Sequence, residues 1–95
     1  MLTPAQSRAA RALIDWSQEE LATASHLGLS TVRDFEKGRR VPTHNNLVAI
    51  RRALEEAGVQ FIPENGGGAG VRLRKQMAPP DEDIRPEQLT SENGA

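Results

Sequence analysis

The chain of 95 residues contains no cysteine, no tyrosine and only three aromatic side chains, Trp16, Phe35 and Phe61. The absence of cysteine excludes a disulfide framework, a thiolate nucleophile and any zinc site with cysteine ligands. Two histidines, His26 and His44, are too few for a histidine-rich metal site. No apolar run approaches the roughly 20 residues of a membrane-spanning helix, and the N-terminus has no apolar signal-peptide region. We therefore expect a cytoplasmic domain with a small aliphatic core that uses no metal and no cofactor.

Net charge is also small, since twelve Lys and Arg against thirteen Asp and Glu leave a formal charge of −1. Taken alone, this total argues against a nucleic-acid partner. The distribution along the chain reverses that argument. Residues 1–75 contain eleven basic and eight acidic side chains, whereas residues 76–95 contain one arginine and five acids. Six basic residues and only two acids fall within 33–52. The sequence predicts a basic domain followed by an acidic tail.

Glycine and proline divide the chain into three parts. In residues 1–58 they stand only at positions that suit helix boundaries. Residues 59–75 contain two short alternating segments on either side of a glycine-rich stretch, which favours a β-hairpin. Residues 76–95 combine three prolines and five acids with few apolar side chains. Such a segment buries too little surface to offset its ordering entropy, so we predict a disordered acidic tail.

Local signals predict four helices in residues 1–58. Thr3 before Pro4 and Ser17 before Glu20 are typical N-terminal caps, and Thr43 caps the last helix. The expected ranges are 4–13, 18–25, 29–37 and 44–57. The buried faces are expected to contain Ala9, Ala12 and Leu13, then Leu21 and Ala22, then Val32 and Phe35, and finally Leu47, Ile50 and Leu54. Arg8 and Arg11 are expected on the surface of the first helix.

In the predicted hairpin, Val59 and Phe61 face Val71 and Leu73. An isolated hairpin is marginally stable in water, so this one must pack on another surface. It can pack on either of two surfaces: the helical domain of the same chain, or the edge strand of a second chain. The second choice would make residues 59–75 the contact of a homodimer.

Two motifs identify a likeness to a known family. Residues 17–22 read SQEELA, and residues 31–42 read TVRDFEKGRRVP, ending in a basic loop. Together they closely resemble the XRE family of Cro and phage-repressor-type regulators, over about residues 3–58. The resemblance implies a mainly α, four-helix helix-turn-helix domain that binds double-stranded DNA in bacterial cytoplasm, at the nucleoid. It also implies transcription regulation, with repression expected, by a dimer on a palindromic operator.

The resemblance implies roles for individual residues as well. The recognition helix would be about Leu29–Lys37, lying in the major groove. Base-facing positions fall on Leu29, Ser30, Arg33 and Asp34, and phosphate-facing positions on Gln18, Thr31, Lys37, Arg39 and Arg40.

The chain departs from the family pattern at the turn between the second and third helices. His26 stands where relatives usually have glycine, and Gly28 replaces the usual polar cap. Histidine tolerates a left-handed backbone better than most residues, so we expect the turn to form. Leu29 stands where many relatives have a polar base reader, and we expect it to contact a thymine methyl group.

Several of these residues have a second interpretation. Arg33 can instead contact a phosphate or form a solvated ion pair, and Gln18 can be an ordinary first-turn residue. Ser30 and Thr31 can serve the start of the helix rather than DNA. Lys37 fits either role equally.

Two further hypotheses use the parts outside the helical domain. An antitoxin that binds a toxin partner and its own promoter would use the hairpin and the acidic tail for the protein contact. Alternatively, the tail folds back over the basic region and weakens DNA binding. An enzyme is not expected, because the glycine run lacks the Lys-Ser/Thr of a phosphate-binding loop and no nucleophile–base pair is in view.

Overall fold

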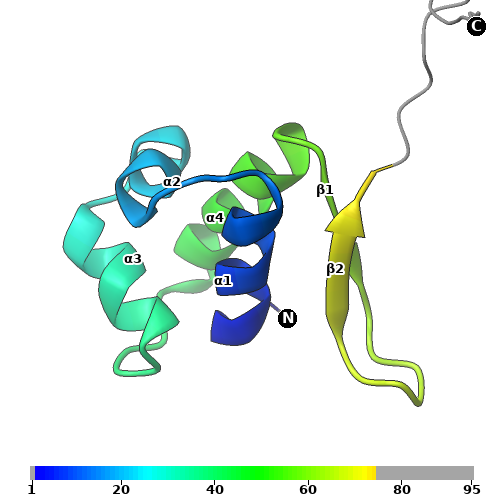
Figure 1. Ribbon diagram of the computed structural model, residues 1–95. Helices are drawn as coiled ribbons and strands as arrows, with labels where there is room; N and C mark the ends of the chain where they lie inside the picture. The colour runs from blue at the N-terminus through cyan, green and yellow to red at the C-terminus, as the bar shows by residue number, and fades with distance from the viewer. Residues whose placement is uncertain (1, 75–95) are drawn as a thin grey trace, which may run out of the picture.

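The computed structural model describes residues 2–74. Its elements in chain order are α1 (Pro4–Leu13), α2 (Gln18–Ser25), α3 (Leu29–Glu36), α4 (His44–Glu56), β1 (Val59–Ile62) and β2 (Gly70–Leu73). The expected mainly helical fold with a C-terminal hairpin is confirmed. In Figure 1, α1 and α4 occupy the middle of the molecule, with α2 and α3 on one side and the hairpin on the other. The predicted tail, 76–95, lies outside the described residues.

The helices begin at the predicted capping residues. The Thr3 hydroxyl accepts the Gln6 N–H at 3.1 Å, and the Gln6 side chain accepts the Thr3 N–H at 3.0 Å. Ser17 and Glu20 form the same reciprocal pair at 3.0 and 2.7 Å, and Thr43 caps α4. These hydrogen bonds satisfy backbone donors that the first helical turn leaves without partners. The observed ends of α3 and α4 fall one residue before the predicted ends.

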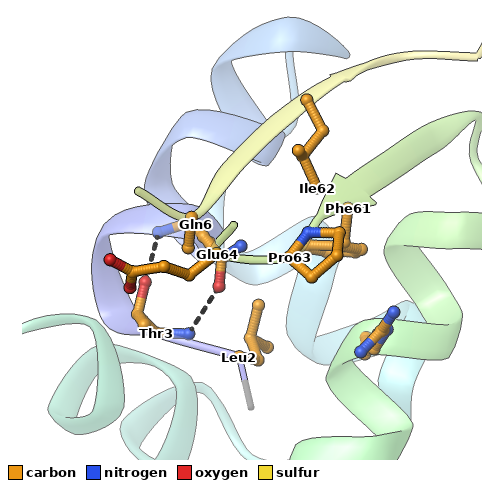
Figure 2. Close-up of a pocket in the computed structure, with 9 residues that line it drawn as sticks. Leu2, Thr3, Gln6, Phe61, Ile62, Pro63 and Glu64 are labelled. Atoms are coloured by element: carbon orange, nitrogen blue, oxygen red, sulfur yellow. Dashed lines mark hydrogen bonds between the residues drawn. The ribbon is translucent and has the colours of Figure 1, made fainter. Parts of the chain in front are cut away.

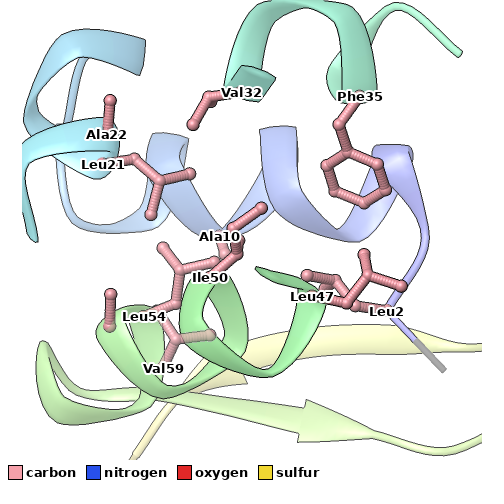
Figure 3. Packing of buried hydrophobic residues seen from close by; sticks show 11 residues of the cluster. Leu2, Ala10, Leu21, Ala22, Val32, Phe35, Leu47, Ile50, Leu54 and Val59 are labelled. Atoms are coloured by element: carbon pink, nitrogen blue, oxygen red, sulfur yellow. The ribbon is translucent and has the colours of Figure 1, made fainter. Parts of the chain in front are cut away.

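The core is small and aliphatic, as the composition predicts, and side chains from all four helices meet in it (Figure 3). Its members are Leu2, Ala10, Leu21, Ala22, Val32, Phe35, Leu47, Ile50, Ala53, Leu54 and Val59. Trp16 and Leu27 are half-buried against this cluster, while Val59 extends it from the helices into the hairpin. The hairpin is therefore part of the same hydrophobic core.

The prediction for the buried face of α1 was wrong. Ala9, Ala12 and Leu13 are exposed, whereas Gln6, Ser7 and Ala10 are the buried residues of this helix. The apolar pattern favoured the wrong side because two of the buried side chains are polar and find partners in other elements. Gln6 donates to the backbone carbonyl of Gly70 in β2 at 3.1 Å, and Ser7 donates to a carboxylate on α3.

The hairpin packs on its own helical domain. Val59 pairs with Leu73 and Phe61 pairs with Val71, so the two pairs of alternating residues face each other as predicted. Val59 is fully buried, Phe61 and Val71 lie against the core, and Leu73 is 52% exposed. Because the sheet has two strands in the described part of the chain, each strand keeps one unpaired edge.

Candidate nucleic-acid interface

The turn between α2 and α3 brings the two helices into a helix-turn-helix arrangement. His26 ends α2 in the left-handed region, with φ 60° and ψ 37°. The N–H of Leu27 then donates to the carbonyl of Ala22 at 2.9 Å and closes the turn. A left-handed backbone is unfavourable for most residues with a Cβ atom, although histidine is found there more often than most. The turn thus forms without the usual glycine.

One side of α3 is anchored in the protein and the other faces solvent. Val32, Phe35 and Glu36 are buried against the neighbouring helices. Ser30 and Arg33 are exposed on the opposite side. An eight-residue helix held along one side presents its other side as a rigid surface, which is what docking into a DNA groove requires.

The four predicted base-facing residues differ in exposure. Ser30 and Arg33 are exposed, whereas Leu29 and Asp34 are half-buried. Leu29 also packs against the hydrophobic core, so its side chain supports the fold in addition to any contact with a base. All four lie in α3, as expected, but the two exposed ones are the better placed to reach a partner.

A tight backbone turn directs the loop that follows α3. Gly38 has φ 75°, and its N–H donates to the carbonyl of Phe35 at 2.9 Å. The N–H of Arg39 donates to the carbonyl of Asp34, also at 2.9 Å. This is the Schellman arrangement, for which glycine is favoured at the left-handed position. It places Arg39 and Arg40 directly after the recognition helix, both exposed.

Four exposed cations gather at α3 and its following loop, and we name them the basic surface: Arg33, Lys37, Arg39 and Arg40. Within residues 2–74, none of them forms a salt bridge. Arg33 and Lys37 stand four residues apart on one helix face, a like-charge spacing that disfavours the helix. The other two basic residues predicted near this region lie on α4, where Arg51 pairs with Glu55 at 3.0 Å.

Behind the recognition helix, the buried carboxylate of Glu36 joins α3 to α1 and α2. The side chain is 1% exposed and forms an ion pair with Arg11 at 2.7 Å. Ser7 donates to its Oε2 at 2.5 Å, and Gln18 donates to its Oε1 at 3.0 Å. Arg8 donates to its backbone carbonyl. The network fixes the position of Gln18 at the start of α2 relative to the recognition helix.

The Glu36 carboxylate is held in its ionised form. Burial by itself raises the pKa of Glu36. Hydrogen bonds from Arg11, Ser7 and Gln18, together with the positive charge of Arg11, outweigh that effect and bring the pKa below its ordinary value of 4.5. The network is consequently intact at neutral pH, and acid weakens it.

Sequence reasoning missed this network. Arg11 was expected on the surface, yet only 18% of its side chain is exposed. Glu36 stands within the family motif with no role implied by it, and Ser7 belongs to no motif. The motif in residues 31–42 contains one signal that could have pointed to this network: the acid Glu36 stands just before the turn at Gly38. The partners of that acid lie in α1, which no local pattern connects to it.

A groove lies on the other side of the molecule, between the start of α1, helix α4 and the hairpin (Figure 2). Its volume is about 270 Å³, and its walls include Leu2, Phe61 and Pro63. The Arg51 guanidinium lies 5.2 Å from the centre of the Phe61 ring and closes one side. No residue of the basic surface lines this groove.

The helix-turn-helix geometry, with an anchored recognition helix and exposed cations beside it, defines a DNA-binding domain. A family model described as helix-turn-helix matches residues 8–58, more than half of the chain. The chain belongs to this helix-turn-helix family, of the XRE type, and is a DNA-binding regulator. Among curated proteins, no sequence matches the chain. In residues 2–74 no helix has the length and apolar character needed to cross a membrane.

Proposed function

We propose that the protein is a sequence-specific transcriptional repressor that acts as a two-fold dimer on a palindromic operator at the bacterial nucleoid. The observation that carries the proposal is the outer side of α3, where exposed Ser30 and Arg33 stand beside the basic surface. A helix anchored along its inner side can enter the major groove, while neighbouring cations meet the phosphates.

Two sets of contacts follow from this orientation. Arg33 would bind guanine through two hydrogen bonds, and Leu29 would contact a thymine methyl group. The proposed base-facing residues are Leu29, Ser30, Arg33 and Asp34. The proposed phosphate-facing residues are Gln18, Thr31, Lys37, Arg39 and Arg40.

Gln18 has a supported place in this scheme. One of its amide N–H groups is already bound to Glu36, at 3.0 Å. Its other amide hydrogen and its backbone N–H at the first position of α2 are free of any such bond to Glu36 and can donate to a phosphate oxygen. A side chain that is fixed in advance loses less entropy on binding, which favours a phosphate contact there.

The dimer would join through the hairpin. Each strand keeps an unpaired edge, and Leu73 at the end of β2 is an exposed apolar side chain. Two hairpins related by a two-fold axis would pair edge to edge, and helix-turn-helix dimers generally bind half-sites about 34 Å apart.

DNA binding is tested with duplexes selected from a random pool, followed by fluorescence anisotropy over a range of salt concentrations. A dimer with about six to ten phosphate contacts should give a slope of log affinity against log salt near −5 to −9. The selected site should be a palindrome. A flat salt response, or selection that enriches no sequence, would overturn the proposal.

Matched variants separate the two kinds of contact. Arg33→Ala should weaken binding to the selected site by about 1–3 kcal/mol and relax preference at one base pair. Arg39→Ala should weaken selected and unrelated duplexes alike and make the salt slope shallower by about 1 per subunit. Arg52→Ala, which removes an exposed cation of α4, is the control and should change neither property.

The dimer contact is tested by sedimentation analysis of Leu73→Glu, which should shift the equilibrium toward monomer. Val48→Glu is the matched control, because Val48 is an exposed apolar residue of α4, 38% exposed, away from the hairpin edge. Equal effects of the two substitutions, or a wild-type protein that is monomeric at all concentrations, would contradict the hairpin contact.

A further inference from the structure

We propose that the acidic tail, residues 76–95, docks on the basic surface of its own chain and competes there with DNA. The inference deepens the proposed function, since it concerns the same surface. It rests on charge complementarity between that surface and a segment that lies outside the described residues. The occupant is the tail of the same molecule, not that of a second copy.

The first argument concerns which cations have partners. Most arginines outside the basic surface donate a hydrogen bond to an acceptor in residues 2–74. These are Arg8 and Arg11 to Glu36, Arg51 to the Glu55 carboxylate, Arg72 to Gln60, and Arg74 to the Glu55 carbonyl. In the same part of the chain, no hydrogen bond from the four side chains of the basic surface is found. Within residues 2–74, the intramolecular acceptors thus serve five of the six other arginines, all but Arg52, and none of the four side chains of the basic surface.

The second argument concerns where the unused acids are. Asp81, Glu82 and Asp83 are consecutive, and Glu87 and Glu92 follow. Arg85, between Asp83 and Glu87, is the one basic residue of residues 76–95. This segment contains five of the thirteen acids of the chain. A run of carboxylates offers the same recognition chemistry as a DNA backbone, namely anionic oxygens for arginine and lysine. The surface and the tail are therefore complementary in charge.

The third argument concerns reach. The tail starts after Arg74 at the end of β2, on the side of the molecule opposite α3 (Figure 1). The structure measures 52 × 33 × 19 Å along its principal axes. Fully extended from Arg74, the chain reaches about 30 Å at Asp83, about 45 Å at Glu87 and about 60 Å at Glu92. Glu87 and Glu92 can thus pass around the domain and meet the basic surface without any change in the fold, whereas the reach of Asp81–Asp83 is too short for that path.

The consequence is competition that depends on salt. Tethering makes the local concentration of the tail on its own domain of order millimolar, so weak ion pairs suffice to occupy the surface. Ion pairs of exposed groups are individually weak and are screened by salt. Binding to unrelated DNA, which depends almost wholly on phosphate contacts, should suffer more than binding to the selected site. The tail would in this way raise the preference for the operator.

The test uses the full-length chain and a full-length variant with Glu87→Gln and Glu92→Gln. At about 50 mM salt the variant should bind an unrelated duplex about threefold more tightly than the wild type, as two lost surface pairs allow. The difference should vanish near 0.5 M salt. A matched control, Gln88→Ala with Ser91→Ala, changes the tail without changing its charge and should leave the affinity unchanged.

A second measurement needs no DNA. In proton–nitrogen spectra at low salt, the backbone amide signals of Arg33, Lys37, Arg39 and Arg40 should differ between the variant and the wild type. Added salt should produce the same shifts in the wild type, at any protein concentration. Shifts that gather around Arg52 or Arg72 instead, or that grow with protein concentration, would overturn docking on this surface of the same chain.

The two proposals can fail separately. If the wild type binds no DNA but the amide signals of the basic surface shift as expected, the docking stands and the proposed function fails. If the wild type binds DNA with a steep salt dependence while neither affinity nor spectra respond to the variant, the docking fails and the proposed function stands.

Discussion

At the scale of single residues, Glu36 connects the parts that a DNA-binding domain must hold in register. Its carboxylate receives hydrogen bonds from Ser7 and Arg11 on α1 and from Gln18 on α2. A buried ion pair adds little net stability compared with apolar side chains of equal volume, but loss of one partner is costly. Its value here is positional, since it fixes the recognition helix against the start of α2.

Glu36→Gln should destabilise the protein by about 3 kcal/mol, because Arg11 is left without its counter-charge in a largely buried position. Urea unfolding followed by circular dichroism measures the loss. Glu55→Gln is the control: it breaks the exposed Arg51 pair and should cost no more than about 0.5 kcal/mol. Equal losses in the two variants would show that Glu36 is not the connecting residue we describe.

The left-handed backbone of His26 lowers the stability of the folded protein. Its φ of 60° suits glycine, which has no Cβ atom to clash. We expect His26→Gly to stabilise the protein by about 1 kcal/mol and to raise the melting temperature by about 4–8 °C. His44→Gly, in the first turn of α4, should lower the melting temperature instead. A lower melting temperature for His26→Gly would contradict the strain argument.

At the scale of elements, α1 shows where pattern reading succeeds and where it fails. Its start at Thr3 and its length were predicted, because a capping box and a proline act within one turn. Its buried side was not predicted. Ser7 and Gln6 are polar, and a hydrophobic pattern assigns polar residues to solvent. Their burial depends on acceptors in α3 and β2 that the local sequence does not contain.

Paired substitutions in α1 test this orientation. Ala10 is completely buried, so Ala10→Glu should abolish cooperative folding by placing a charge in the core without a partner. Ala12 is exposed, so Ala12→Glu should change stability by less than about 0.5 kcal/mol. Thermal unfolding of both variants decides the matter. If Ala12→Glu is more destabilising than Ala10→Glu, the buried face of α1 is the one that the sequence pattern predicted.

The other elements also combine features that the sequence predicted with features that it left open. The ranges of α2 and α4 were predicted to within one residue, and so was the facing of Val59 and Phe61 on Val71 and Leu73. Alternation is sufficient for this, because a slip by one residue would turn Val59 out of the core. The surface on which the hairpin packs was left open by the sequence, and the structure shows it on its own helices.

At the scale of the whole molecule, the fold separates two surfaces. The basic surface and α3 lie on one side and the hairpin lies on the other, with α1 and α4 between them (Figure 1). A protein contact through the hairpin can therefore form without covering α3 or the basic surface. The buried network of Glu36 is the polar connection that keeps α1, α2 and α3 in this arrangement.

That connection makes the stability of the whole molecule depend on pH. The pKa of Glu36 is lower in the folded protein than its ordinary value of 4.5, so the unfolded chain binds the proton more readily. The stabilisation is fully present above pH 4.5 and is lost as the pH falls through the folded pKa. Urea unfolding between pH 7 and pH 3 should show this decline, and Glu36→Gln should make it less steep. An unchanged slope in the variant would show that other carboxylates cause the acid sensitivity.

Local sequence was sufficient to predict where the helices start and end, the helix-turn-helix motif and the segregation of charge along the chain. Each of these rests on interactions within a few residues or on a simple count along the chain. The buried side of α1, the role of Glu36 and the packing of the hairpin follow only from the folded arrangement. Their partners are 29 residues apart for Ser7 and Glu36 and 64 residues apart for Gln6 and Gly70. Contacts at such separations exist only once the chain has folded, and no local pattern encodes them.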